Sequence, residues 1–264
     1  NHRQINRLMP FTTAPLFHAL QLLETGDSAR FHMPGHKGEP VFNTYADIFA
    51  IDFTETYGTG NLYTGEGPIR DAEVAAARYF GSEDCFFLTG GSTQGILAML
   101  GTAVGRGGAV LLDREVHKSV CYGCALLGIT PHFFSAPLIE PFAVSGALPV
   151  KDAEAPTYYG IRRAIPEFAD LCRAHGKLLL VDGAHGAHFP AVGLPTPVAE
   201  GADMAVLSMH KTLPCMGQGA VLLSAAGVDR RALRENTMLF GTSSPSYPIM
   251  ASIDLARAYT EGPG

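Results

Sequence analysis

Short apolar runs alternate with longer amphipathic segments along this chain, and this alternation restricts the possible fold more than any other feature. Runs with the length of buried strands occupy residues 85–88, 110–112, 178–181 and 220–223. No charged residue interrupts them, as in strands covered on both faces. Residues 69–80 and 95–104 place apolar side chains three and four positions apart, which is typical of helices on a sheet. The sequence therefore predicts a three-layer α/β/α fold around a mainly parallel sheet.

Size and composition indicate one globular domain. The chain has 264 residues, of which 47% are hydrophobic, so it can bury a sizeable core. No repeat, low-complexity tract or convincing linker divides it, and residues 1–264 are interpreted as a single domain. The formal charge is -6, from 19 Lys and Arg against 25 Asp and Glu, without the basic run that nucleic acids need. We therefore expect a small-molecule ligand.

Nothing in the sequence indicates a membrane or an oxidising compartment. No apolar stretch reaches the roughly 18 residues of a membrane span, and residues 1–4 lack the layout of a signal peptide. The five cysteines are an odd number, which disfavours a disulfide framework. Cys121 and Cys124 form a CxxC, but their apolar surroundings favour packing over zinc or redox chemistry. We expect a cytoplasmic protein with reduced thiols.

Polar residues follow the predicted strands at their carboxyl ends, where α/β sheets bind ligands. The strand at 85–88 leads into residues 89–95 (TGGSTQG), so hydroxyls and free backbone N–H groups meet at a helix N-terminus. This combination favours an anion site, with a plain helix cap as the alternative. The run matches neither a P-loop nor the GxGxxG pattern.

Asp182 directly follows the predicted strand at 178–181, and His185 and His188 come shortly after it. Asp182 is a candidate partner for a protonated pyridine nitrogen, because a carboxylate keeps such a ring charged and able to accept electrons. The rival interpretation is a metal site of Asp182, His185 and His188, although their spacing fits no helical metal-binding motif. His117, after strand 110–112, is either a stacking partner for a planar ring or a structural histidine.

Lys211 lies in the run SMHKT, directly after the strand-like residues 204–207. An amine whose pKa is lowered by its surroundings can condense with an aldehyde such as pyridoxal phosphate (PLP). Taken alone, a lysine is more often a solvated surface residue. Ser208 and His210 beside it offer phosphate contacts. A phosphate cradle, a strand-end Asp, a His and a Lys on separate strand ends together predict a PLP site.

Several stretches resemble the Orn/Lys/Arg decarboxylase family of fold-type-I PLP enzymes. They are residues 31–38 (FHMPGHKG), 52–67, 90–95 (GGSTQG), 113–120 (DREVHKSV), 156–160 (PTYYG), 182–189, 208–213 and 242–247 (TSSPSY). They follow the order of the family and span most of the chain. The resemblance implies the PLP-binding large domain with an N-terminal arm, and a homodimer or larger homo-oligomer with active sites at the subunit interfaces.

The resemblance also implies roles for the matching residues. Lys211 is implied to hold the cofactor as an imine, Asp182 to bind its ring nitrogen and His117 to stack on the ring. His185 is implied to lie near the ring hydroxyl. The implied phosphate contacts are Ser92, Thr93, Ser208 and His210. Lys211, Asp182 and His117 are therefore the predicted catalytic residues.

The chain departs from the family pattern in two places. The family continues into a smaller C-terminal domain, which is absent here after the predicted helix at 250–259. Before PTYYG the family has a helix and an apolar strand, whereas residues 151–155 (KDAEA) cannot supply that strand. Either a segment is omitted from the sequence at that point, which we favour, or a true deletion opens the sheet.

The activity that the resemblance implies is decarboxylation of arginine, lysine or ornithine to the corresponding amine and CO2, feeding polyamine metabolism. One alternative is another fold-type-I reaction, such as amino transfer or Cα acyl transfer. A second is a PLP-binding protein without catalytic activity. A metal-dependent hydrolase built on His185 and His188 is the third.

Overall fold

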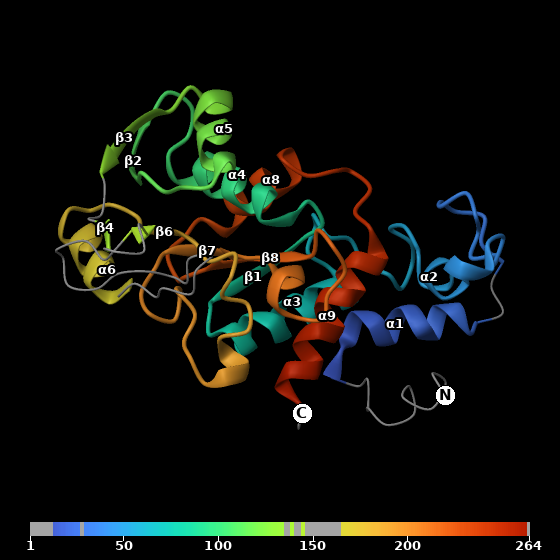
Figure 1. Ribbon diagram of the computed structural model, residues 1–264. Helices are drawn as coiled ribbons and strands as arrows, with labels where there is room; N and C mark the ends of the chain where they lie inside the picture. The colour runs from blue at the N-terminus through green and yellow to red at the C-terminus, as the bar shows by residue number, and fades with distance from the viewer. Residues whose placement is uncertain (1–12, 27–28, 135–137, 140–143, 146–164, 263–264) are drawn as a thin grey trace.

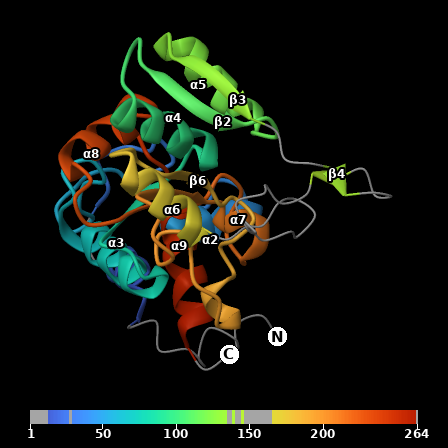
Figure 2. The ribbon, with the colours of Figure 1, turned by 90° about the vertical axis from the view of Figure 1, so that its left-hand side faces the viewer.

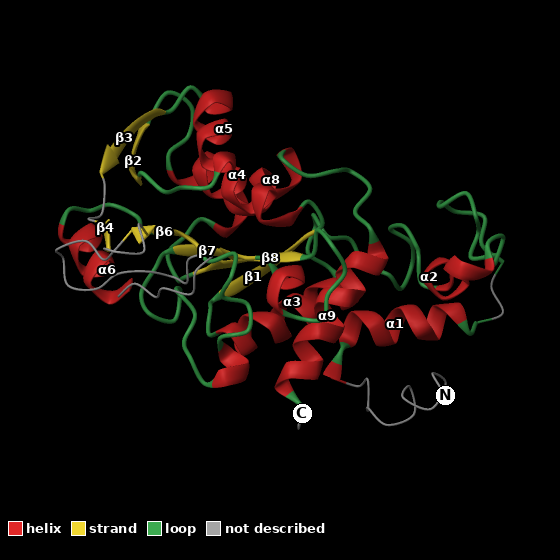
Figure 3. Ribbon diagram, viewed as in Figure 1, coloured by secondary structure: helices red, strands yellow, loops and turns green. Residues whose placement is uncertain are grey.

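A central sheet between two layers of helices forms the body of the molecule (Figures 1 and 3). The computed structural model describes residues 13–26, 29–134, 138–139, 144–145 and 165–262. Within these ranges no helix is long and apolar enough to cross a membrane. The predicted α/β fold of three layers is confirmed.

Four strands form the central sheet, in the order β1-β8-β7-β6. Their bounds are β1 (Asp84–Leu88), β6 (Leu180–Asp182), β7 (Met204–Leu207) and β8 (Ala220–Ser224). β8 runs antiparallel to both β1 and β7, whereas β6 and β7 are parallel. Three strands therefore share one direction, as the prediction of a mainly parallel sheet requires, and β8 alone is reversed. The connection from β7 to β8 holds only the four-residue helix α7 (Met209–Thr212), which is too short to form the crossover that a parallel return needs.

Helices cover both faces of this sheet (Figure 1). One face carries α4 (Gly91–Ala103) and α8 (Arg230–Leu239), with α5 (Lys118–Leu127) packed against α4. The other face carries α3 (Gly67–Phe80) and α9 (Tyr247–Glu261), with α1 (Pro15–Glu24) packed against both. The remaining helices are α2 (Ala46–Ala50), α6 (Ile165–Ala174) and the 3-10 turns η3 (Asn43–Tyr45) and η4 (Pro190–Val192). The predicted helix at 95–104 begins four residues earlier, because the glycine-rich run before it is already helical.

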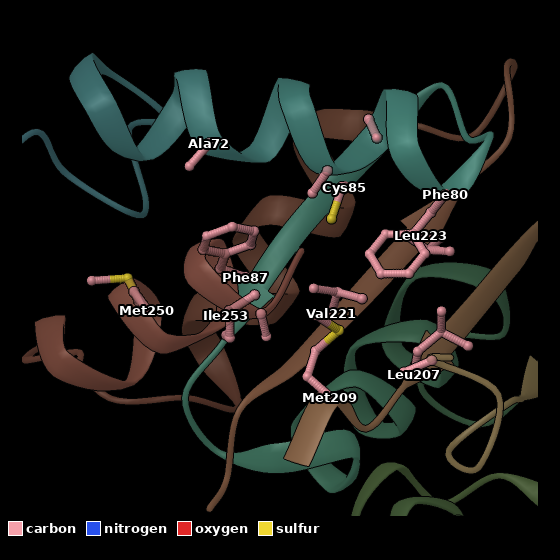
Figure 4. Close-up of a cluster of buried hydrophobic side chains, with 14 of the residues drawn as sticks. Ala72, Phe80, Cys85, Phe87, Leu207, Met209, Val221, Leu223, Met250 and Ile253 are labelled. Atoms are coloured by element: carbon pink, nitrogen blue, oxygen red, sulfur yellow. The ribbon is translucent and has the colours of Figure 1, made fainter. Parts of the chain in front are cut away.

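Successive side chains of the central strands pack against opposite helical layers. In β1, Cys85 and Phe87 join the cluster formed with α3 and α9, whereas Phe86 and Leu88 join the cluster formed with α4 and α8. Figure 4 shows the first cluster, in which Phe87 lies beside Val221 of β8. Each fully buried apolar side chain of this size contributes about 1.5–3 kcal/mol. The uninterrupted apolar runs in the sequence follow from this two-sided burial.

A second pair of strands is separate from the central sheet. β2 (Ala109–Asp113) and β3 (Thr130–Phe134) are parallel, and in the described ranges neither pairs with a third strand. They lie with α5 at one end of the molecule (Figure 2). Leu111 of β2 is 68% exposed. β4 (Leu138–Ile139) and β5 (Val144–Ser145) form a short antiparallel pair. The PTYYG run and residues 151–155 before it fall outside the described residues.

A buried carboxylate protects the outer edge of β1. Glu73 of α3 accepts a hydrogen bond from Phe87 N–H (3.1 Å), and Arg234 of α8 donates to both carboxylate oxygens (2.8 and 2.6 Å). Arg234 also donates to the Leu62 carbonyl (2.7 Å) and lies over the Phe86 ring. Burying a charge is tolerated only when it is paired and hydrogen-bonded. This pair therefore fastens α3, β1 and α8 to one another.

We predict that Arg234→Ala lowers the free energy of unfolding by about 3 kcal/mol, because Glu73 would stay buried with only Arg70, 3.8 Å away, as a countercharge. Urea denaturation at fixed protein concentration measures the loss. The control is Arg231→Ala on the same helix: Arg231 is 88% exposed and pairs with Glu235, so its removal should leave stability within error. In a Glu73→Met background the Arg234 substitution should cost far less. Equal losses in both backgrounds would contradict the pairing.

Candidate functional site

The carboxyl ends of three strands lie at one edge of the central sheet, and the predicted site residues follow them. β1 leads into α4, β6 ends at Asp182, and β7 leads into α7 through Ser208. Because β1, β6 and β7 share a direction, these three ends lie along the same edge. Gly91 N–H donates to the Gln218 carbonyl (2.9 Å). This hydrogen bond joins the start of α4 to the segment between α7 and β8.

The first turn of α4 has the properties of an anion site. Gly91 has φ +71°, a left-handed conformation that glycine adopts without strain. The N-cap residue, Gly90, has no side chain with which to cap the helix. N–H groups of a first turn lack intrahelical partners, and the helix dipole adds positive charge there. Ser92 is half-buried and Thr93 is exposed, so both predicted phosphate contacts lie on a turn suited to phosphate.

Lys211 and His185 lie side by side. The Lys211 side chain is exposed, because α7 carries it beyond the buried end of β7, and its Nζ lies 3.3 Å from His185 Nε2. Burial lowers the pKa of His185, the positive charge of Lys211 lowers it further, and the Asp182 carboxylate opposes both effects. The His185 imidazole is therefore predominantly neutral at pH 7.

Asp182 is reached by solvent but is closely surrounded by protein. Desolvation raises the pKa of its carboxyl group, against the opposing effects of the Ala184 N–H (3.2 Å), Lys211, His117 and His185. The predicted lysine and two histidines are thus near enough to Asp182 to lower its pKa against the effect of desolvation. A carboxylate in such a recess would be stabilised by a protonated ring nitrogen placed beside it.

The turn after β7 contains two buried hydroxyl groups that have no hydrogen-bond partner among the described residues. Ser208 is fully buried, yet its Oγ makes no hydrogen bond within the described part of the chain, and the same holds for Thr212 Oγ1. Buried hydroxyls are normally hydrogen-bonded, so this turn has capacity for a polar ligand. His210 donates from Nδ1 to the Gly219 carbonyl (3.0 Å), which orients its ring.

His117 is the N-cap residue of α5. Its Nδ1 accepts from Ser119 N–H (3.3 Å) and lies 2.7 Å from Ser119 Oγ. The imidazole is exposed, and these two contacts fix it at Nδ1. Its position follows β2 and α5, so His117 comes from the separate strand pair, unlike the other predicted residues.

The sequence did not single out two glutamines of this region. Gln94 and Gln218 contact the start of α4 through Gly90 and Gly91. A signal for Gln94 was present, since it is a polar residue on the apolar face of a helix. For the rival metal site the geometry gives no support: the part of the chain that is described contains no group of three His, Cys, Asp or Glu placed for a metal.

Comparisons with known proteins agree with this geometry. A family model described as "Orn/Lys/Arg decarboxylase, major domain" matches residues 14–155 and 153–263. The "Uncharacterized protein YaaO" of Bacillus subtilis is 37% identical over 94% of this chain and 56% of its own length. An arginine decarboxylase of Halalkalibacterium halodurans is 31% identical over 93% of this chain and 55% of its own length. The chain thus spans about half the length of these relatives.

Solved structures share the fold. Lysine decarboxylase A from Pseudomonas aeruginosa superimposes with a TM-score of 0.78 at 23% identity, covering 99% of this chain and 42% of its own. A Sphingomonas wittichii serine palmitoyltransferase gives a TM-score of 0.57 at 19% identity, covering 96% of this chain and 58% of its own. The fold is that of the fold-type-I enzymes.

The two segments matched by the family model meet just before PTYYG, at residues 153–155. The alignment with the Bacillus subtilis relative is 272 positions long, although it covers only 94% of the 264 residues. The relative therefore contains residues without a counterpart here. This agrees with the departure noted before PTYYG.

We predict that the pKa of His185 responds in opposite directions to two substitutions. Lys211→Met should raise it towards the ordinary histidine value, and Asp182→Asn should lower it further, because each removes one neighbouring charge. Ring-proton chemical shifts followed against pH measure both in the cofactor-free protein. Lys177→Met, before the opposite end of β6, is the control and should change nothing.

The sign of the stability effect follows from the lowered pKa. The unfolded chain binds this proton at a higher pH than the folded chain, so stability should fall as pH drops through the ordinary histidine value. If the pKa of His185 were unchanged in both variants, the result would contradict the proximity of His185, Lys211 and Asp182.

Proposed function

The chain belongs to the Orn/Lys/Arg decarboxylase family, and from this membership and the geometry of its site we propose that it binds PLP and decarboxylates a basic amino acid. The observation that carries the proposal is the placement of an amine, a carboxylate and an anion-binding helix turn at one edge of the sheet. Lys211, Asp182 and the first turn of α4 supply these groups from three different strand ends. PLP presents an aldehyde, a pyridine nitrogen and a phosphate, which need these three partners.

The residues present fit this cofactor. Lys211 would hold it covalently, and Asp182 would bind the ring nitrogen. The buried hydroxyl of Ser208, which has no partner within the described residues, would join Ser92 and Thr93 at the phosphate. The exposed imidazole of His117 would cover one face of the ring, with His185 near the ring hydroxyl and His210 near the phosphate.

The chain's own groups would prepare the site for the reaction. His185 Nε2, 3.3 Å from Lys211 Nζ, can accept a hydrogen bond from the ammonium group and so orient it, because its lowered pKa keeps the imidazole neutral. The Lys211 side chain becomes nucleophilic when its ammonium group loses a proton to water. Asp182 would hold a proton on the ring nitrogen by its charge. When bound, PLP supplies the electron sink for the bond broken at Cα. Orientation of the substrate carboxylate then determines that CO2 leaves.

The names of relatives indicate the substrate class. Arginine decarboxylases and lysine decarboxylases are among the proteins that this chain resembles. We propose arginine, lysine or ornithine as substrate and the corresponding amine as product, with a role in polyamine metabolism in the cytoplasm. The competing possibilities are another fold-type-I reaction and PLP binding without catalysis.

An exposed apolar surface on the N-terminal arm supports self-association. Phe31 (93%), Phe42 (62%) and Tyr57 (100%) expose large hydrophobic side chains there, and in Figure 1 the segment around α2 extends away from the sheet. Contiguous exposed apolar residues mark protein interfaces. We propose a second copy of the protein as the partner, giving a homodimer or a larger homo-oligomer.

We predict a single covalent adduct after the protein is incubated with PLP and reduced with borohydride. Peptide mass mapping should locate the pyridoxyl group on Lys211, because its amine lies beside His185 and near Asp182. Lys211→Ala should carry no adduct. The control Lys118→Ala removes an exposed lysine beside His117 and should keep the adduct. An adduct spread over surface lysines would exclude a specific site.

We predict CO2 release from one of arginine, lysine and ornithine by the full-length protein. Lys211→Ala should abolish turnover, and Asp182→Ala should reduce kcat by about 100- to 1000-fold through lost electrostatic stabilisation. Radiolabelled carboxyl groups make the measurement direct. Specific PLP attachment without CO2 from any amino acid would support the noncatalytic alternative instead.

A further inference from the structure

Gln94 is a polar side chain of α4 that is buried against α8. It is 2% exposed, in a helix whose other buried residues include Ile96 and Ala98. Burying an amide without hydrogen bonds costs free energy. A glutamine at such a position therefore needs partners for both ends of its amide group.

Both ends have a partner. The Gln94 side-chain oxygen accepts from Gly90 N–H (2.9 Å), and its nitrogen donates to the Thr237 carbonyl (2.8 Å). Gly90 N–H can only donate and the carbonyl can only accept, so the orientation of the amide is unambiguous. Gly90 is the N-cap of α4 and Thr237 lies in the last turn of α8. The amide thus links two segments more than 140 positions apart in the sequence.

The bond to Gly90 takes the place of a missing helix cap. Gly90 has no side chain with which to accept a hydrogen bond from the first turn. Gln94 instead accepts a hydrogen bond from the N–H of the N-cap residue, as the Glu or Gln of a capping box does. This contact satisfies the N-cap N–H and leaves the N–H groups of the following turn without intrahelical partners. The side chain of Gln94 therefore holds residues 90–93 in their conformation from the buried side of the turn.

A second loop packs against the same amide. A Cβ atom at Gly241 would lie 2.4 Å from the Gln94 nitrogen and 2.9 Å from the Tyr63 hydroxyl. The Tyr63 hydroxyl donates to the Thr242 carbonyl (2.6 Å). The loop that begins the TSSPSY run is thus held against Gln94 on its other side, and the amide cannot swing away from Gly90 without displacing it.

We propose that Gln94 is a positioning residue for the phosphate of the cofactor, acting through Gly90 and the first turn of α4. This inference rests on the proposed function. Gln94 would preorganise residues 90–93, so that the turn does not have to be ordered when a phosphate binds. Its effect is confined to ligands that carry the phosphate, which distinguishes it from a residue that only stabilises the fold.

The test compares PLP with pyridoxal, which has the same ring and aldehyde but no phosphate. Gln94→Met keeps the volume and removes both hydrogen bonds. It should weaken PLP binding on the order of tenfold and leave pyridoxal binding unchanged, as measured by absorbance titration. Gln94→Asn, which is too short to span both partners, should give the same selective loss and provides the test if the methionine variant does not fold.

The control is Asn236→Ala. Asn236 of α8 donates to Thr102 Oγ1 (3.2 Å), so it also bridges α4 and α8, but at the far end of α4. Its loss should lower the melting temperature without changing the ratio of the two affinities. If the Gln94 variants lost PLP and pyridoxal binding equally, or lost neither, the role of Gln94 would be overturned while the proposed function would stand. Failure of the unchanged protein to bind either ligand would overturn the proposed function as well.

Discussion

The reversed strand β8 determines where chemistry can take place in this molecule. It pairs antiparallel with β1 on one side and β7 on the other, so those two strands must share a direction, and β6 follows β7 in parallel. Residues that are distant in the sequence therefore reach one edge: the first turn of α4, Asp182 and Lys211. Helices on both faces bury β1, β7 and β8 along their whole length.

Buried polar groups in this fold fall into two kinds. Glu73 and Gln94 are buried and hydrogen-bonded to partners on other elements, so they fasten helices to strands and loops. Ser208 and Thr212 have buried hydroxyls without a partner in the described residues, and both adjoin Lys211. The first kind favours the folded state, and the second costs free energy until a ligand satisfies it. The first kind therefore supports the scaffold, including the first turn of α4, and the second kind belongs to the candidate site itself.

Strand positions were predictable because two-sided burial leaves an unbroken apolar run, as in β1, β7 and β8. β3 gave no such signal: it contains Pro131 and His132, and its residues are largely exposed. The start of α4 was placed late, because Gly91 adopts a left-handed conformation within a run that resembles a loop. The convergence of Asp182, His185 and Lys211 could be inferred from strand ends alone. The hydrogen bond from Gln94 to Thr237 depends on α8, which no local pattern relates to α4.

The separation of β2 and β3 from the central sheet affects how the molecule opens. In the described ranges no strand hydrogen bond joins this pair to the four-stranded sheet, and α5 packs on α4 through side chains such as Val120 and Cys124. Side-chain packing can loosen without breaking a strand ladder, so this pair and α5 can exchange their amide protons as a unit of their own. His117 belongs to that unit. Its distance from Asp182 can therefore fluctuate with subglobal opening, while Lys211 and His185 stay fixed to the main sheet.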